Sequence, residues 1–377
     1  MPSNRGTLFW LAYPGNLAPS AELYILAARE TTFEAAIPGQ GFSVTGTAGP
    51  GAPGIVSLPE DLAAVQSNEV IEQKGIRVTS ERPVTVILRG GTVGTLSSTE
   101  AYLGLPVDML GSEYFTVLGY QESVSARGFP GNEEPSQLTI AAVEDNTRVT
   151  VTPSCESLAG SQPGVPINLV LDQGEVWQYR CGFLRDVTGT RVRSNRPIAV
   201  FGGSRFSDVP PGVAFCDYLV EQLIPVELWD REYFVPPLLN GAANLVRVLA
   251  SEDETWVQIL TPRLFSRFHR FYSPPQYNIN LVNIVAPVNA AVQLDGADVT
   301  GFSPFPGGRY QWAAVALDPG EHVISSTEPV MGYAYGFSPA IAYGYPTGLS
   351  IQDVDALALI LIVFLLVVLL LLVILSQ

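Results

Sequence analysis

IRVTSERPVTV, at residues 76–86, returns as VRSNRPIAV at residues 192–200 and as VISSTEPV at residues 323–330. Each copy places apolar and β-branched residues on both sides of a Ser-X-X-Pro element. Proline fixes φ at about −65° and has no N–H, and serine can hydrogen-bond the backbone of a turn. We therefore predict a strand, a turn and a second strand at each copy.

A second phrase precedes the first one in the same order. It reads LYILAARETTF at residues 23–33, LTIAAVEDNTRV at residues 138–149 and VRVLASEDETWV at residues 246–257, which we interpret as strand, acidic turn, threonine and strand. A third phrase, YLGLPVDMLGSEYF at residues 102–115, parallels YLVEQLIPVELWDREYF at residues 218–234. Ordered phrases at a fixed period predict a threefold repeat of about 115 residues.

The repeat and the composition together predict the fold class. The 377 residues include 35 Gly and 30 Pro, a density that leaves room for short strands but not for long helices. We predict an all-β fold of three tandem β-sandwich-like units followed by one C-terminal transmembrane helix. The predicted boundaries are 1–100, 101–216 and 217–350 for the units and 351–377 for the tail.

The tail is an uninterrupted apolar run. Residues 356–375 contain no charged residue, no Pro and no Gly, and at about 1.5 Å per residue they span roughly 30 Å, the thickness of a bilayer core. We predict a membrane anchor that begins at Ala356, passes Phe364 and ends at Leu375. The N-terminal segment has no apolar run long enough for a signal peptide, so we expect a tail-anchored protein.

Charge and residue usage exclude several function classes. The net charge of −16, with only 20 basic residues, argues against a nucleic-acid partner. The two histidines, His269 and His322, accompany no Gly-X-Ser-X-Gly motif, and we interpret His322 beside Glu321 as structural. The acidic residues 144–145 and 252–254 read as hairpin turns rather than calcium sites, because they lack a spaced Asp ladder. We predict no catalytic residue, no cofactor and no metal site.

One segment, residues 263–272 (RLFSRFHRFY), is both basic and aromatic in an otherwise acidic protein. Arginine and aromatic side chains are typical of contact surfaces. An ordinary strand pair or a solvated loop is the alternative interpretation. The predicted partner-contact residues are Arg263, Arg267, Phe268, His269, Arg270, Phe271 and Tyr272.

Several motifs give the chain a family resemblance. They are DVTGT at 186–190, SNRPIAVFGG at 194–203, CDYLVEQLIP at 216–225, PGEH at 319–322, YGF at 335–337 and YGYPTG at 343–348. From about residue 6 to residue 348 the chain resembles the N-terminal domain family of IgGFc-binding protein, a domain also found in uncharacterised bacterial proteins. The resemblance implies an extracellular-type, non-enzymatic binding or adhesive module, and it transfers no catalytic residue.

The cysteines depart from the family pattern. Relatives often carry a cysteine shortly before the position of Cys216, but residues 204–210 (SRFSDVP) contain none, so we expect Cys216 to be unpaired. This loss suits a head that folds in a reducing compartment. Cys155 and Cys181 flank a predicted hairpin and form a possible disulfide that the sequence leaves open.

These observations predict a non-enzymatic, membrane-anchored structural or binding protein. Its β-rich head contacts other proteins or copies of itself, and its C-terminal helix contacts the lipid bilayer. Two settings remain open. One is a single-pass protein of the cell surface, and the other is a virion structural protein that links an internal lipid membrane to a protein shell.

Overall fold

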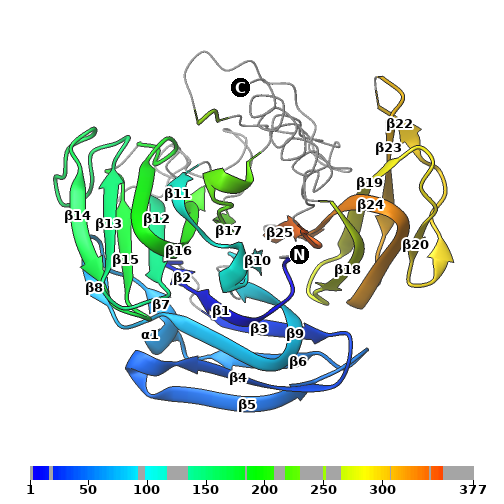
Figure 1. The fold of residues 1–377 in the computed structure, drawn as a ribbon, viewed down its shortest axis with the longest axis horizontal. Helices are drawn as coiled ribbons and strands as arrows, with labels where there is room; N and C mark the ends of the chain where they lie inside the picture. Colours follow the sequence, from blue (N-terminus) through cyan, green and yellow to red (C-terminus); the bar gives the residue numbers. More distant parts are fainter. Residues whose placement is uncertain are drawn as a thin grey trace, which may run out of the picture.

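The three Ser-X-X-Pro phrases lie in the middle of three long strands, one in each of three similar sheets (Figure 1). The computed structural model describes residues 3–16, 20–91, 98–116, 135–182, 185–207, 217–229, 249–251, 265–305, 307–338 and 341–350. The regular secondary structure of these residues is almost entirely β-strand, which confirms the predicted all-β class.

The first unit has the strand order β5-β4-β9-β3-β6, with β1 and β10 also paired to β9. Its elements are β1 (Gly6–Leu11), β2 (Tyr13–Pro14), β3 (Ala21–Ala27), β4 (Thr31–Ile37), η1 (Pro38–Gln40), β5 (Phe42–Ala48), β6 (Gly54–Leu58), α1 (Glu60–Ala63), β7 (Ala64–Val65), β8 (Ile71–Glu72), β9 (Ile76–Gly90) and β10 (Glu100–Gly104). The short strand β8 pairs with β15 of the second unit, so the chain of the first unit extends the sheet of the second.

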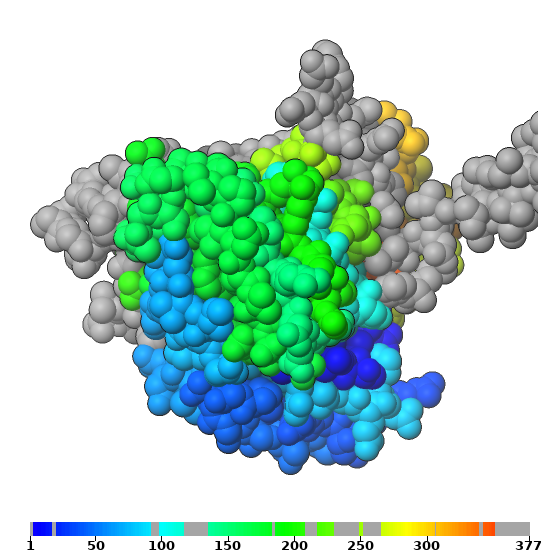
Figure 2. All heavy atoms as spheres, turned by 60° about the vertical axis from the view of Figure 1, so that its left-hand side comes forward, coloured from blue at the N-terminus to red at the C-terminus, as the bar shows by residue number. Residues whose placement is uncertain are grey.

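The second unit has the order β14-β13-β16-β12-β15, with β11 and β17 also paired to β16. Its elements are η2 (Val107–Met109), β11 (Gly111–Phe115), β12 (Ser136–Ala142), β13 (Thr147–Thr152), β14 (Ile167–Leu171), β15 (Val176–Arg180), β16 (Arg191–Ser207) and β17 (Asp217–Gln222). Figure 2 shows this unit, in green, lying against the first unit, in blue.

The third unit has the order β21-β20-β24-β19-β23-β22, with β18 and β25 also paired to β24. Its elements are η4 (Val226–Leu228), β18 (Ser266–Ser273), β19 (Ile279–Pro287), β20 (Val292–Leu294), β21 (Ala297–Asp298), β22 (Ser303–Pro304), β23 (Tyr310–Ala316), β24 (Gly320–Ser338) and β25 (Ile341–Pro346). The three units therefore share one topology around the long strands β9, β16 and β24.

The Ser-X-X-Pro element is a bend within one continuous strand, and our prediction of a turn between two strands is wrong. In β9, residues up to Ser80 pair with β4, and residues from Val84 onward pair with β3. The pairing with β1 skips from Thr79 to Val84 at the same place. Ser80 Oγ donates to the Arg82 carbonyl at 2.8 Å, and Pro83 has no N–H to leave unpaired. Because of the bend, one strand pairs in both layers of the unit.

The third copy of the second phrase does not mark the equivalent strands of the third unit. Residues 246–257 lie outside the described residues, apart from 249–251. β3 and β4 of the first unit correspond to β12 and β13 of the second, which agrees with the phrases at 23–33 and 138–149. In the third unit the corresponding strands are β19 and β20, which follow the predicted residues 246–257. The repeat is real, but its copies are unevenly spaced: β12 begins 115 residues after β3, and β19 begins 143 residues after β12.

Each unit has an inner and an outer layer, and the inner layers are buried on both faces. In the C-terminal half of β9, Val86 and Leu88 point into the core of the first unit, while Ile87 between them packs against the third unit. In β16, Val200 points into the core of the second unit, while Phe201 packs on the first. The units are thus joined by extended apolar contacts, which explains why these strands read as unbroken hydrophobic runs.

The last strands of the three units, β10, β17 and β25, meet near the middle of the molecule (Figure 1). β10 and β17 complete the first and second sheets, which therefore extend past the predicted ends at residues 100 and 216. The two ends of the described chain also meet, because Asn4 N donates to the Leu349 carbonyl at 2.8 Å and Leu349 N donates to Asn4 Oδ1 at 3.0 Å. Ser3 and Ser350 form an antiparallel bridge beside them.

The predicted membrane anchor, with Ala356, Phe364 and Leu375, lies outside the described residues. Among the residues that the structure does describe, no helix has the length and apolarity needed to cross a bilayer.

Gly203 of the family motif is required by strand packing. It lies in β16 opposite Val220 of β17, and a Cβ at this position would lie 1.9 Å from the Leu219 carbonyl oxygen. We expect Gly203→Ala to lower the free energy of unfolding by about 2 kcal/mol, because backbone must move to admit the methyl group. Chemical denaturation measures the loss, and Gly182→Ala, where a Cβ would lie 3.4 Å from the Glu156 carbonyl oxygen, is the control expected to change little.

Candidate binding site

The predicted contact segment forms β18, which pairs antiparallel with β24. Arg263 lies outside the described residues. The structure distributes the other six side chains over three environments, because alternate residues of a strand point to opposite faces. His269 and Phe271 point into the third unit, Phe268, Arg270 and Tyr272 point to the other face, and Arg267 is exposed.

His269 is a structural residue of the third unit. Its Nε2 lies 3.0 Å from the Ser266 carbonyl oxygen and 3.1 Å from that of Val330, and its Nδ1 lies 2.8 Å from Thr347 Oγ1. Both carbonyl oxygens are acceptors, so a proton lies on Nε2, and in the neutral ring Nδ1 accepts from the Thr347 hydroxyl. Burial lowers the pKa of His269 to about 4. Phe271 packs beside it in the core, where its ring lies 5.5 Å from that of His322.

The burial of His269 predicts that the stability of the protein depends on pH. Because the folded protein binds the proton of His269 less tightly than the unfolded chain, stability falls as pH drops below the ordinary histidine pKa of about 6.5. Between pH 7 and pH 4.5, we expect the free energy of unfolding of wild type to fall by about 2.5 kcal/mol more than that of His269→Gln. Urea denaturation of both proteins across this range measures the difference. A difference independent of pH would contradict the neutral buried ring.

The opposite face of β18 contacts the first unit. The Tyr272 ring stacks on the Tyr24 ring of β3 with centroids 4.6 Å apart. Arg270 forms an ion pair with Glu321 in which both side chains are about nine-tenths buried, and Glu321 Oε1 also accepts the Gly51 N–H at 3.1 Å. Much of the predicted patch therefore joins two units of the same chain. Arg267, with a side chain 62% exposed and an ion pair to Glu328, reaches solvent.

The sequence reasoning missed a group of acidic residues where the three last strands meet. Asp217, at the start of β17, accepts the Thr99 N–H at 2.6 Å and the Tyr218 N–H at 2.8 Å through Oδ1, and the Ala342 N–H at 2.8 Å through Oδ2. Glu100 Oε1 accepts the Gly344 N–H at 2.7 Å. These two carboxylates connect all three units through backbone donors.

The acidic residues of this junction resist ionisation. Burial raises the pKa of Asp217 to about 8, although its three backbone donors favour the charged form. Burial, and next the neighbouring charge of Asp217, raise the pKa of Glu100 well above its usual range. Burial likewise raises the pKa of Glu221. Nearby carboxylates with raised pKa values can mark a catalytic or metal site, but here the backbone N–H groups account for their geometry.

The remaining candidate sites have structural contacts. His322 Nδ1 lies 2.7 Å from Asp295 Oδ2, and its Nε2 lies 2.7 Å from the Asp318 carbonyl, so both ring nitrogens have partners. Asp145 accepts the Gln173 N–H at 2.9 Å, as expected for a hairpin turn. Residues 252–254 lie outside the described part. Within the described residues, no cluster of three His, Cys, Asp or Glu side chains has the spacing of a metal site.

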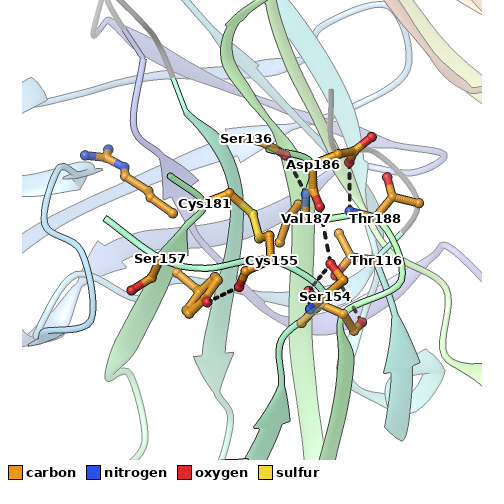
Figure 3. Close-up of a disulfide and its surroundings, with 12 residues drawn as sticks. Thr116, Ser136, Ser154, Cys155, Ser157, Cys181, Asp186, Val187 and Thr188 are labelled. Atoms are coloured by element: carbon orange, nitrogen blue, oxygen red, sulfur yellow. Dashed lines mark hydrogen bonds between the residues drawn. A yellow bond between two sulfur atoms is a disulfide. The ribbon is translucent and has the colours of Figure 1, made fainter. Parts of the chain in front are cut away.

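Cys155 and Cys181 form a disulfide in the core of the second unit (Figure 3). Tyr179 Oη donates to the Cys155 carbonyl at 2.6 Å, and Ser136 Oγ accepts the Val187 N–H at 3.0 Å. The DVTGT motif thus folds over the cystine. Cys216 lies outside the described residues.

The other family motifs are also structural joints. In the motif at 216–225, Tyr218 Oη donates to the Pro14 carbonyl at 2.7 Å and Gln222 Oε1 accepts the Leu105 N–H at 2.8 Å, in addition to the contacts of Asp217. In the motif at 343–348, Tyr345 Oη donates to the Tyr272 carbonyl and Thr347 contacts His269. The motifs therefore specify how the units fit together, and they carry the family relationship rather than a reactive centre.

Comparison with known proteins agrees with this relationship. A model of the family described as IgGFc binding protein matches residues 100–264 and 261–336. The human IgGFc-binding protein is 27% identical over 157 residues, which is 41% of this chain and 3% of the human protein. The chain thus corresponds to a small part of that relative.

Among solved structures, a Streptomyces avermitilis alpha-L-rhamnosidase aligns over 93% of this chain and 41% of that chain, with 8% identity and a TM-score of 0.17, which is too low to support a structural argument. The family model, by contrast, spans residues 100–336, more than half of the chain, and includes the motifs at 186–190, 194–203 and 216–225. The chain belongs to the IgGFc-binding protein family.

Proposed function

We propose that the chain is a non-enzymatic protein-binding head, held at a membrane by residues 356–375. The family match carries this proposal. The human relative is named for binding the Fc part of IgG. For this chain we propose protein binding in general, since its motif residues are occupied by contacts between its own units.

The disulfide supports the cell-surface setting over the virion setting. Disulfides persist in oxidising compartments and are rare in the cytosol. Cys155 and Cys181 are both buried, so the bond is part of the folded core. This pairing opposes the reducing compartment that we inferred from the missing cysteine. Labelling of intact cells with a membrane-impermeant reagent tests the setting, and a head protected from the reagent would favour a virion or internal location.

Photocrosslinking tests the proposed function. A photoreactive amino acid replaces Arg267, whose side chain is 62% exposed, in the full-length protein in its native membrane. The same substitution at Val165, which is 57% exposed on the second unit, is the matched control. We expect a discrete protein adduct from position 267 and none from position 165. No protein adduct from either position would count against a protein-binding head.

An enzyme assay tests the alternative class. A hydrolase screen of the purified chain is expected to show no turnover. Activity that disappears in His322→Ala would overturn the non-enzymatic proposal, because the Asp295–His322 pair would then be the first candidate for a catalytic base.

A further inference from the structure

The bends of the three long strands carry different charges at equivalent positions. In the second unit, Arg196 of the bend forms an ion pair with Glu144 in the turn between β12 and β13. In the third unit the bend residue is Glu328, and it pairs with Arg267 of β18. Both bends are therefore neutralised within the chain.

Among the described residues, the first unit has no such ion pair between its turn and its bend. Ala27 pairs with Val84, as Ala142 pairs with Ile198 in the second unit, so the turn residue that corresponds to Glu144 is Arg29. The bend residue that corresponds to Arg196 is Arg82. The first unit thus places two arginines where the second unit places an ion pair.

These arginines line a hollow between the first and third units. Its volume is about 440 Å³, and it is lined by Arg5, Ala28, Arg29, Arg82, Pro83 and Phe268. Arg29 and Arg82 are exposed and Arg5 is half-buried. Within the part of the chain that the structure describes, the guanidinium groups of these three arginines have neither an ion-pair nor a hydrogen-bond partner.

Other charged side chains lie close to the hollow. Arg270 lies behind Phe268, with its Cζ 5.8 Å from the ring centroid, and the Arg5 Cζ lies 5.9 Å from the same centroid. Burial, and next the charge of Arg270, lower the pKa of Arg5 from its usual value. Glu321 is paired with Arg270. Glu30 and Glu81, the sequence neighbours of Arg29 and Arg82, form no ion pair with these arginines within the described residues.

We propose that this hollow binds an acidic peptide segment of a protein partner, with carboxylates on Arg5, Arg29 and Arg82 and an apolar side chain on Ala28, Pro83 and Phe268. Guanidinium groups bind carboxylates through paired N–H donors. The apolar wall favours a peptide over a sulfated glycan, which has no apolar side chain to place there. The hollow is also much larger than a single inorganic ion. This inference rests on the proposed protein-binding function and identifies the chemistry of the partner.

A binding assay on the full-length protein in detergent tests the proposal. The probe is a labelled peptide, Asp-Glu-Phe-Glu-Asp, and fluorescence anisotropy at low ionic strength reports its affinity. We expect the acidic peptide to bind, its Asn/Gln counterpart not to bind, and added salt to weaken binding because the contacts are exposed charges. Arg29→Glu, which rebuilds the ion pair of the second unit, is expected to weaken binding at least tenfold without lowering the melting temperature.

The matched control is Arg148→Glu, which makes the same charge change at an exposed arginine of the second unit and is expected to alter affinity less than twofold. Equal loss in both variants, no loss in Arg29→Glu, or absence of peptide binding would overturn the proposal. Tighter binding of a sulfated heparin oligosaccharide that displaces the peptide would overturn it in favour of a glycan. A protein adduct at position 267 without peptide binding refutes this inference alone, whereas peptide binding without any adduct counts against the proposed function instead.

Discussion

Removing the disulfide of the second unit is expected to lower the free energy of unfolding by about 3.5 kcal/mol, because Cys155 and Cys181 close a loop with a sequence separation of 26. The cross-link limits the conformations of the unfolded chain, and both cysteines lie in the core beside Tyr179. Since that core also supports the motif at 186–190, we expect the second unit to become sensitive to protease first.

Denaturant titration of Cys155→Ala/Cys181→Ala against wild type measures the loss, and reductant should destabilise wild type but not the double variant. Cys216→Ala is the control, because Cys216 is predicted to be unpaired. Sensitivity to reductant that is lost in Cys216→Ala would show that Cys216 takes part in the disulfide instead.

Replacing Asp217 by alanine is expected to lower the free energy of unfolding by about 3 kcal/mol at pH 5. The substitution leaves three backbone N–H groups, from Thr99, Tyr218 and Ala342, without their acceptor. These donors belong to three units, because Thr99 directly precedes β10, Tyr218 lies in β17 and Ala342 lies in β25. The variant should therefore loosen the junction as a whole rather than one sheet.

The same substitution has a defined pH dependence. The pKa of Asp217 is raised to about 8 in the folded protein. The protonated group therefore stabilises the wild-type fold at low pH, and this stabilisation is lost as pH rises from about 4 toward 8. The difference in stability between wild type and Asp217→Ala should become smaller over this pH range. Thermal denaturation at several pH values measures it, and Asp298→Ala, at an exposed aspartate that accepts one side-chain hydrogen bond, is the control expected to change stability by less than about 0.5 kcal/mol.

The sequence was sufficient to predict the all-β class and the repeat because the Ser-X-X-Pro bend is a local device. Proline acts on its own backbone in each copy, and Ser80 and Ser194 hydrogen-bond the backbone two residues on in the first two copies, so the bend leaves a recognisable local pattern. The third copy of the other phrase does not mark the equivalent strands, for the opposite reason. The true strand pair, β19 and β20, is joined through Pro287 and Ala290 without an acidic turn, so only pairing with β24 identifies it.

The candidate site was less predictable because it depends on contacts between units. The pattern of β18 shows alternation, but it does not show that the face with Arg270 and Tyr272 is covered by the first unit. Asp217 and Glu100 read as ordinary surface charges, since their backbone partners are remote in the sequence. Arg29 and Arg82 are 53 positions apart in the chain's numbering, and only the bend of β9 brings them to one hollow.

The pairing of residues 3–4 with residues 349–350 has a mechanical consequence. Because Asn4 and Leu349 exchange hydrogen bonds, the three units form a closed ring rather than a string. A pull applied at residue 350 would load the first and third units together, and the ring must open at this pair before any sheet can be peeled from its end. Force applied through the proposed anchor would therefore be shared by the first and third units from the start, rather than acting on the third unit alone.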